Sequence, residues 1–236
     1  MPDVSIVLPV FNEHNIFLSQ CLLSIQKQSV HEWECIIILE STNFDNEKLI
    51  KQITANDPRF RVIVPKLRIG LSASLNLGAQ LAQSEFLARM DSDDIMDPDR
   101  LLEQLRFMNQ NKKVSVVGSY YSKINSNGDV LGVRRYPLRG FPLLLYFVFR
   151  CGLAHPTVMF RKRDFEVVGG YNEKLNYCED LDLWLRYLRI GLKLENSNKV
   201  LLSYRISKRN PSHWVQMLKL RFVHLWRVFF ASGERK

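Results

Sequence analysis

The sequence predicts an α/β fold, in which a mostly parallel sheet is flanked by helices within one domain. Two continuous apolar runs of strand length, VSIVLPV at 4–10 and WECIIIL at 33–39, are typical of strands buried on both faces. Segments of helical period separate these runs, and strands that alternate with helices over short links require a parallel sheet. The chain has 236 residues, of which 46% are hydrophobic, so it can bury one sizeable core.

The first half of the chain keeps this alternation. After the opening strand, Leu18, Cys21, Leu22 and Ile25 have the i, i+3, i+4, i+7 spacing of a helix core stripe. The elements expected after the second strand are, in order, a short helix with Leu49, Ile50 and Ile53, a strand at Phe60–Val64, a helix after Gly70 with Leu71, Leu75, Gly78 and Ala82, and a fourth strand at Phe86–Met90.

The second half departs from a regular alternation. Asp97 and Pro98 are expected as the N-cap and first residue of a helix. Asn127-Gly128 is a strong hairpin turn signal between two strands. The remaining expectations are strands at Val114–Gly118, Ser119–Ile124, Val130–Arg135 and Thr157–Phe160, a buried helix at Phe141–Arg150, and a helix at Leu181–Leu188 ended by Gly191.

The net charge of +9 is concentrated at the C-terminal end. Residues 199–236 hold nine Lys and Arg but only one acidic residue, Glu234, so the rest of the chain is nearly neutral. This distribution favours a charged surface partner for the tail and argues against a nucleic-acid-binding domain. Four scattered cysteines without C-x-x-C spacing, and no leader or spanning segment, predict a reduced, cytosolic protein.

Residues 214–230 form a separate pattern, with most aromatic and aliphatic side chains on one helical face and basic ones on the other. Such an amphipathic helix suits the interface of an anionic membrane, which would place the protein peripherally on the inner face of the cell membrane. The alternative is a C-terminal helix packed on the domain core or on a partner subunit, including a second copy of the chain. The sequence leaves both open.

The fourth strand ends in the acidic cluster Asp91-Ser92-Asp93-Asp94. Three carboxylates within four residues repel one another unless a cation or solvent neutralises them. Hard cations such as Mg²⁺ and Mn²⁺ prefer oxygen ligands, and Asp91 and Asp93, alternating on extended backbone, would point the same way. The alternative is a solvated loop in which Asp94 or Asp97 caps the next helix.

Polar clusters follow four of the expected strands. They begin at Phe11, Glu40, Lys66 and Asp91. Ligands of parallel sheets bind beyond the carboxyl ends of the strands. We therefore expect these distant segments to meet at one crevice.

Taken together, these motifs resemble the family 2 glycosyltransferases of GT-A fold. The resemblance rests on PVFNE at 9–13, GLSASLN at 70–76, DSDD at 91–94 followed by PDRL at 98–101, and EDLDLW at 179–184. It implies a single Rossmann-like domain over residues 1–205, with a nucleotide-binding half at 1–113 and an acceptor half at 114–205. The basic, aromatic helix of residues 206–236 would follow.

The resemblance implies a nucleotide-sugar donor, most simply a UDP-sugar, a Mn²⁺ or Mg²⁺ ion on its diphosphate, and inverting transfer to a hydroxyl of a lipid-linked or surface polysaccharide. The general base would be Asp180, with Glu179 beside it, and the dipole at the start of a helix would keep the Asp180 carboxylate ionised. The metal would lie on Asp93 with Asp91. The residues expected to bind the nucleotide-sugar are Pro9, Phe11, Glu13, Glu40, Arg68, Asp91 and Ser92.

Two departures from the family pattern keep a rival hypothesis open. Glu40 stands where the family usually has Asp, and the histidine usual two residues after Tyr204-Arg205 is absent, so metal affinity should be weaker. The rival is a catalytically inactive, nucleotide-sensing or scaffold subunit of a polysaccharide-assembly complex. Sugar nucleotidyltransfer is disfavoured because PVFNE contains no glycine, and a phosphatase would carry its nucleophilic Asp after the first strand.

Overall fold

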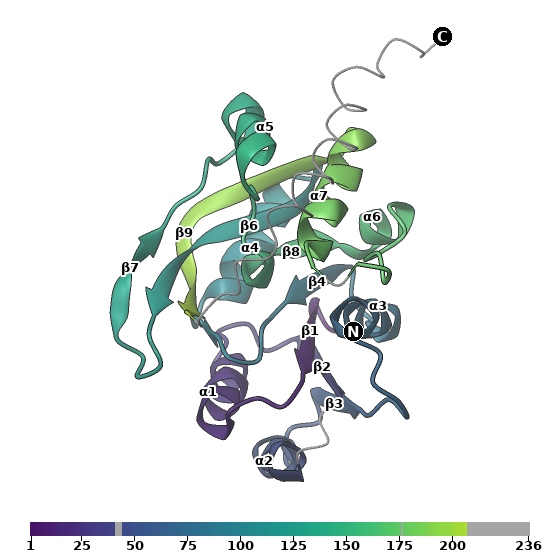
Figure 1. The fold of residues 1–236 in the computed structure, drawn as a ribbon, viewed down its shortest axis with the longest axis vertical. Helices are drawn as coiled ribbons and strands as arrows, with labels where there is room; N and C mark the ends of the chain where they lie inside the picture. Colours follow the sequence, from purple (N-terminus) through teal and green to yellow (C-terminus); the bar gives the residue numbers. More distant parts are fainter. Residues whose placement is uncertain (41–43, 176, 207–236) are drawn as a thin grey trace.

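The computed structural model describes residues 1–40, 44–175 and 177–206, which form one mixed sheet flanked by helices (Figure 1). Within these residues the strand order is β3-β2-β1-β4-β8-β6-β9-β5, and β7 pairs with β6. The strands are β1 (Val4–Val10), β2 (Trp33–Leu39), β3 (Phe60–Ile63), β4 (Phe86–Arg89), β5 (Ile95–Met96), β6 (Val114–Ile124), β7 (Val130–Arg134), β8 (Met159–Arg161) and β9 (Lys193–Arg205).

The first four long strands make a parallel half-sheet, as predicted. β1 lies between β2 and β4, and β3 extends the sheet beyond β2, all in parallel register. β8 then joins β4 to β6 through antiparallel pairs, and β9 runs parallel to β6. The carboxyl ends of β1, β2 and β4 therefore lie at one edge of the sheet, which is where ligands of such sheets bind.

Helices cover both faces of the sheet. They are α1 (Asn15–Gln26), α2 (Phe44–Thr54), α3 (Leu71–Leu81), α4 (Arg100–Gln110), α5 (Gly140–Phe149), α6 (Lys162–Val167) and α7 (Glu179–Arg189). Alternation along β2 divides the core, because Cys35 and Ile37 face one cluster with α1 and α4, whereas Ile36 and Ile38 face the other with α3, α5 and α7. Burial on both faces explains why β1 and β2 are almost wholly apolar.

The N-terminal half matches the predicted elements within a few residues. Gly78 has a packing role in it, since a Cβ at this position would lie 2.3 Å from Cγ1 of Val7. The lack of a side chain thus lets α3 approach β1 closely. The Asn127-Gly128 hairpin is also confirmed, with Gly128 at a positive φ of 92° and its N–H donating to the Asn125 carbonyl at 3.1 Å.

The start of α4 was predicted wrongly. The helix begins at Arg100, and Asp97 instead forms a preceding turn in which its carbonyl accepts the Arg100 N–H at 3.0 Å. The capping acceptor comes from elsewhere in the chain, because Oε1 of Gln28 accepts the Leu101 N–H at 3.1 Å. A cap supplied across 73 residues leaves no local sequence signal.

Three further expectations need correction. Residues 114–124 form a single strand, because Gly118 does not end β6 but leaves room for Asn196, whose Oδ1 would lie 2.5 Å from a Cβ there. Thr157 belongs to a 3-10 turn (His155–Thr157), and the strand begins at Met159. The helix at 140–149 exists, but only Leu143 and Phe147 of it are buried.

The expected amphipathic helix at 206–236 lies outside the described residues, apart from Ile206. Among the described helices, none has both the length and the apolar character needed to cross a bilayer. The four cysteines are free thiols.

Candidate active site

The acidic cluster forms a tight turn directly after β4. The N–H of Asp94 donates to the carbonyl of Asp91 at 3.4 Å, so the backbone here is not extended, contrary to our expectation. The turn still brings the carboxylates together. One oxygen from each of Asp91, Asp93 and Asp94 lies within 4.8 Å of the others. From the sequence we expected only Asp91 and Asp93 to point the same way, whereas the turn also brings the Asp94 carboxylate to them.

The three carboxylates are only partly neutralised by their surroundings. Burial, together with the charges of Asp91 and Glu13, raises the pKa of Asp93 to about 6. Burial, together with the charges of Asp91 and Asp93, raises the pKa of Asp94 well above its usual range. Oδ1 of Asp94 accepts the Arg205 N–H at 2.8 Å, but its buried Oδ2 accepts no hydrogen bond from the described residues. Clustered oxygen ligands with an unmet negative charge fit a divalent cation.

Arginines support this turn from inside the protein. Arg205, from the end of β9, donates from Nε to the Asp93 carbonyl at 2.9 Å and from Nη2 to Gln20 at 2.7 Å. Arg100 is fully buried and donates from Nη2 to the Arg89 carbonyl at 2.7 Å, while burial lowers its own pKa to about 9. These contacts fix the backbone of the turn without covering all of its carboxylate oxygens.

Arg89 links the acidic turn to a second group of carboxylates. It is the last residue of β4, only 3% exposed, and its guanidinium is paired with Asp91. Coulomb interactions weaken with distance, so a charge that affects two groups lies near both. The Arg89 charge opposes the pKa rise, caused mainly by burial, of carboxyls in both groups, namely Asp93, Asp94, Glu179 and Asp180.

Glu179 and Asp180 are adjacent carboxyls in the first turn of α7. Oδ1 of Asp180 accepts the Leu181 N–H at 2.7 Å, and Oδ2 accepts the Cys151 thiol at 3.5 Å. We had expected the helix N-terminus to keep Asp180 readily ionised. Instead the pKa of Asp180 is raised, because burial outweighs the Leu181 hydrogen bond. Burial and the Asp180 charge raise the pKa of Glu179 to about 7.

His155 lies beside this pair. Its Nδ1 is 3.8 Å from Oε1 of Glu179, and its Nε2 is 2.8 Å from the Tyr171 hydroxyl. Burial lowers the pKa of His155 well below its usual range, so the ring is neutral near pH 7. The ring thus adds no positive charge to the pair, which leaves Arg89 as the described cation that acts on both carboxyls.

The loops after β1 and β4 contact each other, as expected. The Ser92 hydroxyl donates to Oε2 of Glu13 at 3.1 Å. Asn46 of α2 holds the Glu13 backbone on both sides, accepting its N–H at 2.9 Å and donating to its carbonyl at 2.8 Å. Pro9 lies one residue before the end of β1, and Phe11 follows the strand. The guanidinium of Arg68 stacks 3.9 Å above the Phe11 ring, although both side chains are exposed.

Glu40 has a structural role that the sequence did not indicate. Its Oε2 accepts the N–H groups of Ile69 and Gly70, each at 2.8 Å, and its Oε1 accepts the Ser74 hydroxyl. Gly70 has a positive φ of 84° and no side chain with which to cap α3. Glu40 supplies that cap from the end of β2, which ties two loops of the crevice together.

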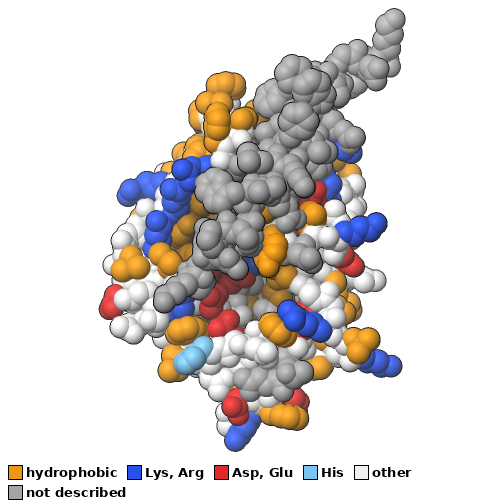
Figure 2. Space-filling model, in the orientation of Figure 1, with side chains coloured by type: hydrophobic (Ala, Val, Ile, Leu, Met, Phe, Trp, Pro, Cys, Tyr) orange, Lys and Arg blue, Asp and Glu red, His pale blue; other side chains and the backbone are white. Residues whose placement is uncertain are grey.

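Four residues of this arrangement were missed in the sequence analysis. Asp94 had been counted in the acidic cluster and considered as a helix cap but not as a metal ligand, and Arg89, Arg100 and Arg205 had no assigned role. A usable signal existed for one of them, since Arg89 is a charged residue within a buried strand, where a charge needs a partner. Figure 2 shows Asp and Glu side chains gathered near the middle of the visible face, at the edge where these loops meet.

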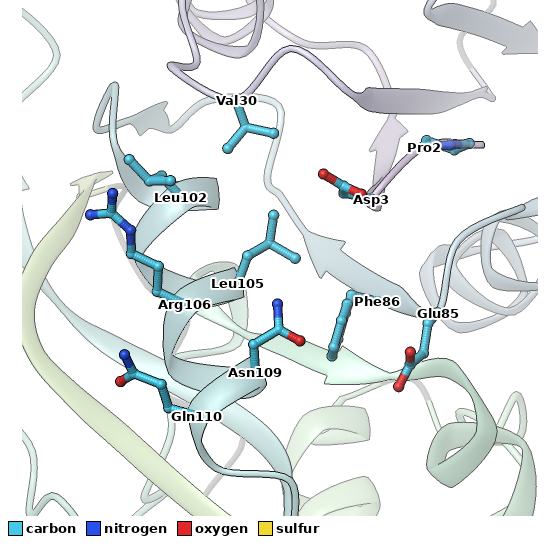
Figure 3. Close-up of a pocket in the computed structure, with 10 residues that line it drawn as sticks. All are labelled: Pro2, Asp3, Val30, Glu85, Phe86, Leu102, Leu105, Arg106, Asn109 and Gln110. Atoms are coloured by element: carbon cyan, nitrogen blue, oxygen red, sulfur yellow. The ribbon is translucent and has the colours of Figure 1, made fainter.

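A separate cavity of about 590 Å³ lies at the other edge of the sheet (Figure 3). Asp3 and Glu85 line it, and each precedes a parallel strand, so the cavity is at the amino ends of β1 and β4. The acidic turn follows the carboxyl end of β4. This cavity is therefore not part of the carboxylate site.

A half-parallel sheet with an acidic turn at its carboxyl edge and a further carboxylate pair nearby defines a transferase of the GT-A type. The family model described as "Glycosyl transferase family 2" matches residues 5–168, and the chain belongs to that family. The protein is a glycosyltransferase.

Relatives along nearly the whole chain agree with this assignment. The O-antigen biosynthesis glycosyltransferase WbnJ of Escherichia coli is 32% identical over 212 residues, which cover 88% of this chain and 82% of the relative. The UDP-Gal:alpha-D-GlcNAc-diphosphoundecaprenol beta-1,3-galactosyltransferase of Escherichia coli is 31% identical over 241 residues, covering 99% and 86%.

Solved structures show the same fold. The crystal structure of S. aureus TarS residues 1–349 in complex with UDP superposes with a TM-score of 0.75 at 18% identity. The match covers 96% of this chain and 66% of that structure. At this identity the similarity concerns the fold alone.

Proposed function

We propose that this glycosyltransferase uses a UDP-sugar and a divalent cation, Mn²⁺ or Mg²⁺, to glycosylate a hydroxyl of a lipid-linked or surface polysaccharide with inversion. The UDP-sugar is supported by the name of the Escherichia coli galactosyltransferase and by the UDP complex of TarS. The acceptor class is supported by the diphosphoundecaprenol and O-antigen in the names of the two relatives. The observation that carries the proposal is the three-carboxylate turn electrostatically linked, through Arg89, to Glu179 and Asp180.

Asp93 and Asp91 would hold the cation, with Asp94 as a buried supporting charge. The fit rests on the 4.8 Å grouping of their oxygens and on the unpartnered Oδ2 of Asp94 among the described residues. When bound, the cation supplies charge neutralisation for the diphosphate leaving group. Arg89 pairs with Asp91 and Arg205 bonds the Asp93 carbonyl, so these two arginines fix the turn from its protein side.

The donor would bind along the loops after β1, β2 and β4. Phe11 and Arg68 offer a stacked, exposed pair suited to a nucleotide base, and Pro9 lies next to them at the end of β1. Glu13 and Ser92 offer hydrogen-bonding groups for the ribose. Three hydrogen bonds from residues 69–74 already occupy the Glu40 carboxylate. Glu40 is therefore proposed to affect binding of the nucleotide base in part by positioning α3.

Asp180 is proposed as the general base that takes the proton of the acceptor hydroxyl. A base with a raised pKa accepts a proton more readily near neutral pH than an ordinary carboxylate does. Glu179, whose pKa is about 7, would remain partly protonated and so would limit the repulsion on Asp180. A single displacement, with the hydroxyl attacking opposite the departing diphosphate, inverts the anomeric centre.

The two halves of the domain would then divide the work. Residues 1–113 carry the parallel strands β1 to β4 and the acidic turn, and residues 114–205 carry α7 with Glu179 and Asp180. We propose that the first half binds the donor and the second half the acceptor. This division would explain why segments distant in the sequence meet at one edge of the sheet.

The direct test is incubation with UDP-, GDP- and dTDP-sugars in the presence of Mn²⁺. We expect donor hydrolysis or transfer with a UDP-sugar, loss of turnover in Asp93→Ala, and a product of inverted anomeric configuration by NMR. Equal turnover with and without EDTA would refute the metal requirement. Turnover with GDP- or dTDP-sugars but not with UDP-sugars would refute the UDP-sugar donor.

A further inference from the structure

The helix α5 exposes an unusually apolar surface. Its sequence is GFPLLLYFVF, and the outward side chains are uncovered: Phe141 is 72% exposed, Phe149 67% and Leu145 46%. Large contiguous apolar patches on a protein surface mark interaction sites.

The helix is held firmly despite this exposure. Leu143 and Phe147 point into the core, and a Cβ on Gly152 would lie only 2.6 Å from the Phe147 ring. Nδ2 of Asn196 donates to the carbonyls of Pro137 at 2.9 Å and Gly152 at 3.0 Å, which joins the segments before and after α5. The exposed residues are thus presented by a fixed element.

Basic residues without acidic partners in the same segment surround the apolar surface. Residues 130–163 contain no Asp or Glu. Arg135, Arg139 and Arg150 are exposed, and Arg139 and Arg150 flank the two ends of α5. Figure 2 shows apolar side chains at the upper edge, where Figure 1 places α5, with Lys and Arg side chains gathered close by.

We propose that the outward face of α5 and its flanking arginines form a docking surface for an anionic phospholipid bilayer. Phe and Leu enter the boundary between head groups and acyl chains, while arginine head groups remain in the phosphate layer. Charge complementarity selects this occupant, since anionic lipid phosphates pair with the arginines that no acidic residue of the segment neutralises. This surface is distinct from the basic C-terminal tail predicted from the sequence.

Docking through α5 would also orient the catalytic carboxylates. The thiol of Cys151, two residues beyond α5, donates a hydrogen bond to Oδ2 of Asp180 at 3.5 Å. A bilayer on α5 would therefore lie near the segment that contacts the proposed base. Membrane docking itself can be measured without any donor or acceptor, so its failure and the failure of the proposed reaction are distinguishable.

Hydrogen exchange of the full chain, with and without vesicles, locates the contact. With vesicles of phosphatidylglycerol and phosphatidylethanolamine we expect slower exchange in peptides covering 140–150, and no change with phosphatidylcholine alone. Protection confined to 207–236 would overturn the proposal. Protection of 140–150 that appears without lipid and grows with protein concentration, together with a dimeric mass in light scattering, would also overturn it and assign the surface to a second copy.

Two double variants measure separately the contributions of the arginine charges and of the exposed phenylalanines to vesicle binding. Arg139→Gln with Arg150→Gln should weaken vesicle binding by about fivefold for each charge removed. Phe141→Ser with Phe149→Ser should weaken it at least as much, and both residues are exposed, so the fold is retained. The matched controls, Lys48→Gln and Phe44→Ser, lie on α2 at the other end of the molecule (Figure 1) and should bind as wild type does. Equal binding by the α5 variants and the controls would overturn the proposal.

Discussion

The buried guanidinium of Arg89 is paired with the carboxylate of Asp91 at the point where β4 ends and the acidic turn begins. The Asp91 side chain is 30% exposed, whereas that of Arg89 is 4% exposed. The pair therefore has one member inside the protein and one at the surface of the site. Through it, a single buried charge acts on both the proposed metal ligands and the proposed base.

Replacing Arg89 tests this coupling. Arg89→Met should lower the free energy of unfolding by about 1–3 kcal/mol, because Asp91 loses its partner but can still be hydrated. It should also move the acidic limb of the pH–activity profile to higher pH, because the carboxyls near Arg89 lose the charge that opposes their raised pKa values. Urea unfolding and a pH–rate profile measure both effects. Arg163→Met, at a side chain 68% exposed, is the control and should change stability by less than about 0.5 kcal/mol.

Glu179 should make stability depend on pH in a specific direction. Its pKa is about 7 in the folded protein and about 4.3 when unfolded, so the folded state binds the proton more tightly. Stability from this group is complete below about pH 4 and is lost as pH rises through about 7, by up to about 4 kcal/mol. Glu179→Gln should therefore be more stable than wild type at about pH 8, and the gain should vanish near pH 4. Equal differences in urea unfolding at the two pH values would contradict this, and the exposed Glu166→Gln is the control.

Asp180→Asn should remove the proposed base while keeping its hydrogen bonds to Leu181 and Cys151 feasible. We expect kcat to fall by about 10²–10⁴, with the affinity for UDP unchanged in calorimetry. Asp182 lies on the same helix but bonds Arg186, with 2.9 Å between Oδ2 and Nε. Asp182→Asn should therefore lower stability more than kcat. A wild-type kcat in Asp180→Asn would exclude Asp180 as the base.

Asp93→Asn should weaken metal binding and donor binding together. Loss of a direct carboxylate ligand should reduce Mn²⁺ affinity by more than the about 10–100-fold typical of an outer hydrogen-bonding partner. Calorimetric titration with Mn²⁺ and UDP, repeated in EDTA, measures the effect. Asp99→Asn, an exposed carboxylate outside the turn, is the control. Unchanged Mn²⁺ binding in Asp93→Asn would place the ion elsewhere.

Glu40→Ala should destabilise the crevice even without substrate. The N–H groups of Ile69 and Gly70 lose their acceptor, which should lower the free energy of unfolding by about 1–3 kcal/mol. Glu40→Asp should have a smaller effect, because a shorter side chain still reaches part of the α3 terminus. The control is Glu47→Ala, which removes an exposed pair with Lys51 and should change stability by less than about 0.5 kcal/mol. An unchanged thermal midpoint in Glu40→Ala would contradict the capping role.

Several features of the fold were predictable because their causes are local. Burial on both faces requires continuous apolar strands such as 33–39, and the chain order of strands and helices then places the loops of Phe11, Glu40 and Asp91 at one edge. The helix expected at Leu181–Leu188 is likewise present, but it begins two residues earlier, at Glu179, with acidic residues in its first turn. The family motifs added the reaction class, which the family comparison confirmed.

The sequence by itself determined the α/β alternation, the acidic motif and the carboxylate pair of this protein. Only the tertiary structure decided which charges surround them, because Arg89, Arg100 and Arg205 reach the turn from different elements. Burial in the folded chain likewise reversed the expectation for Asp180, since desolvation depends on neighbours distant in sequence. The exposure of Phe141 and Phe149 has the same origin, because hydrophobicity is a property of a residue, whereas its covering depends on what packs against it.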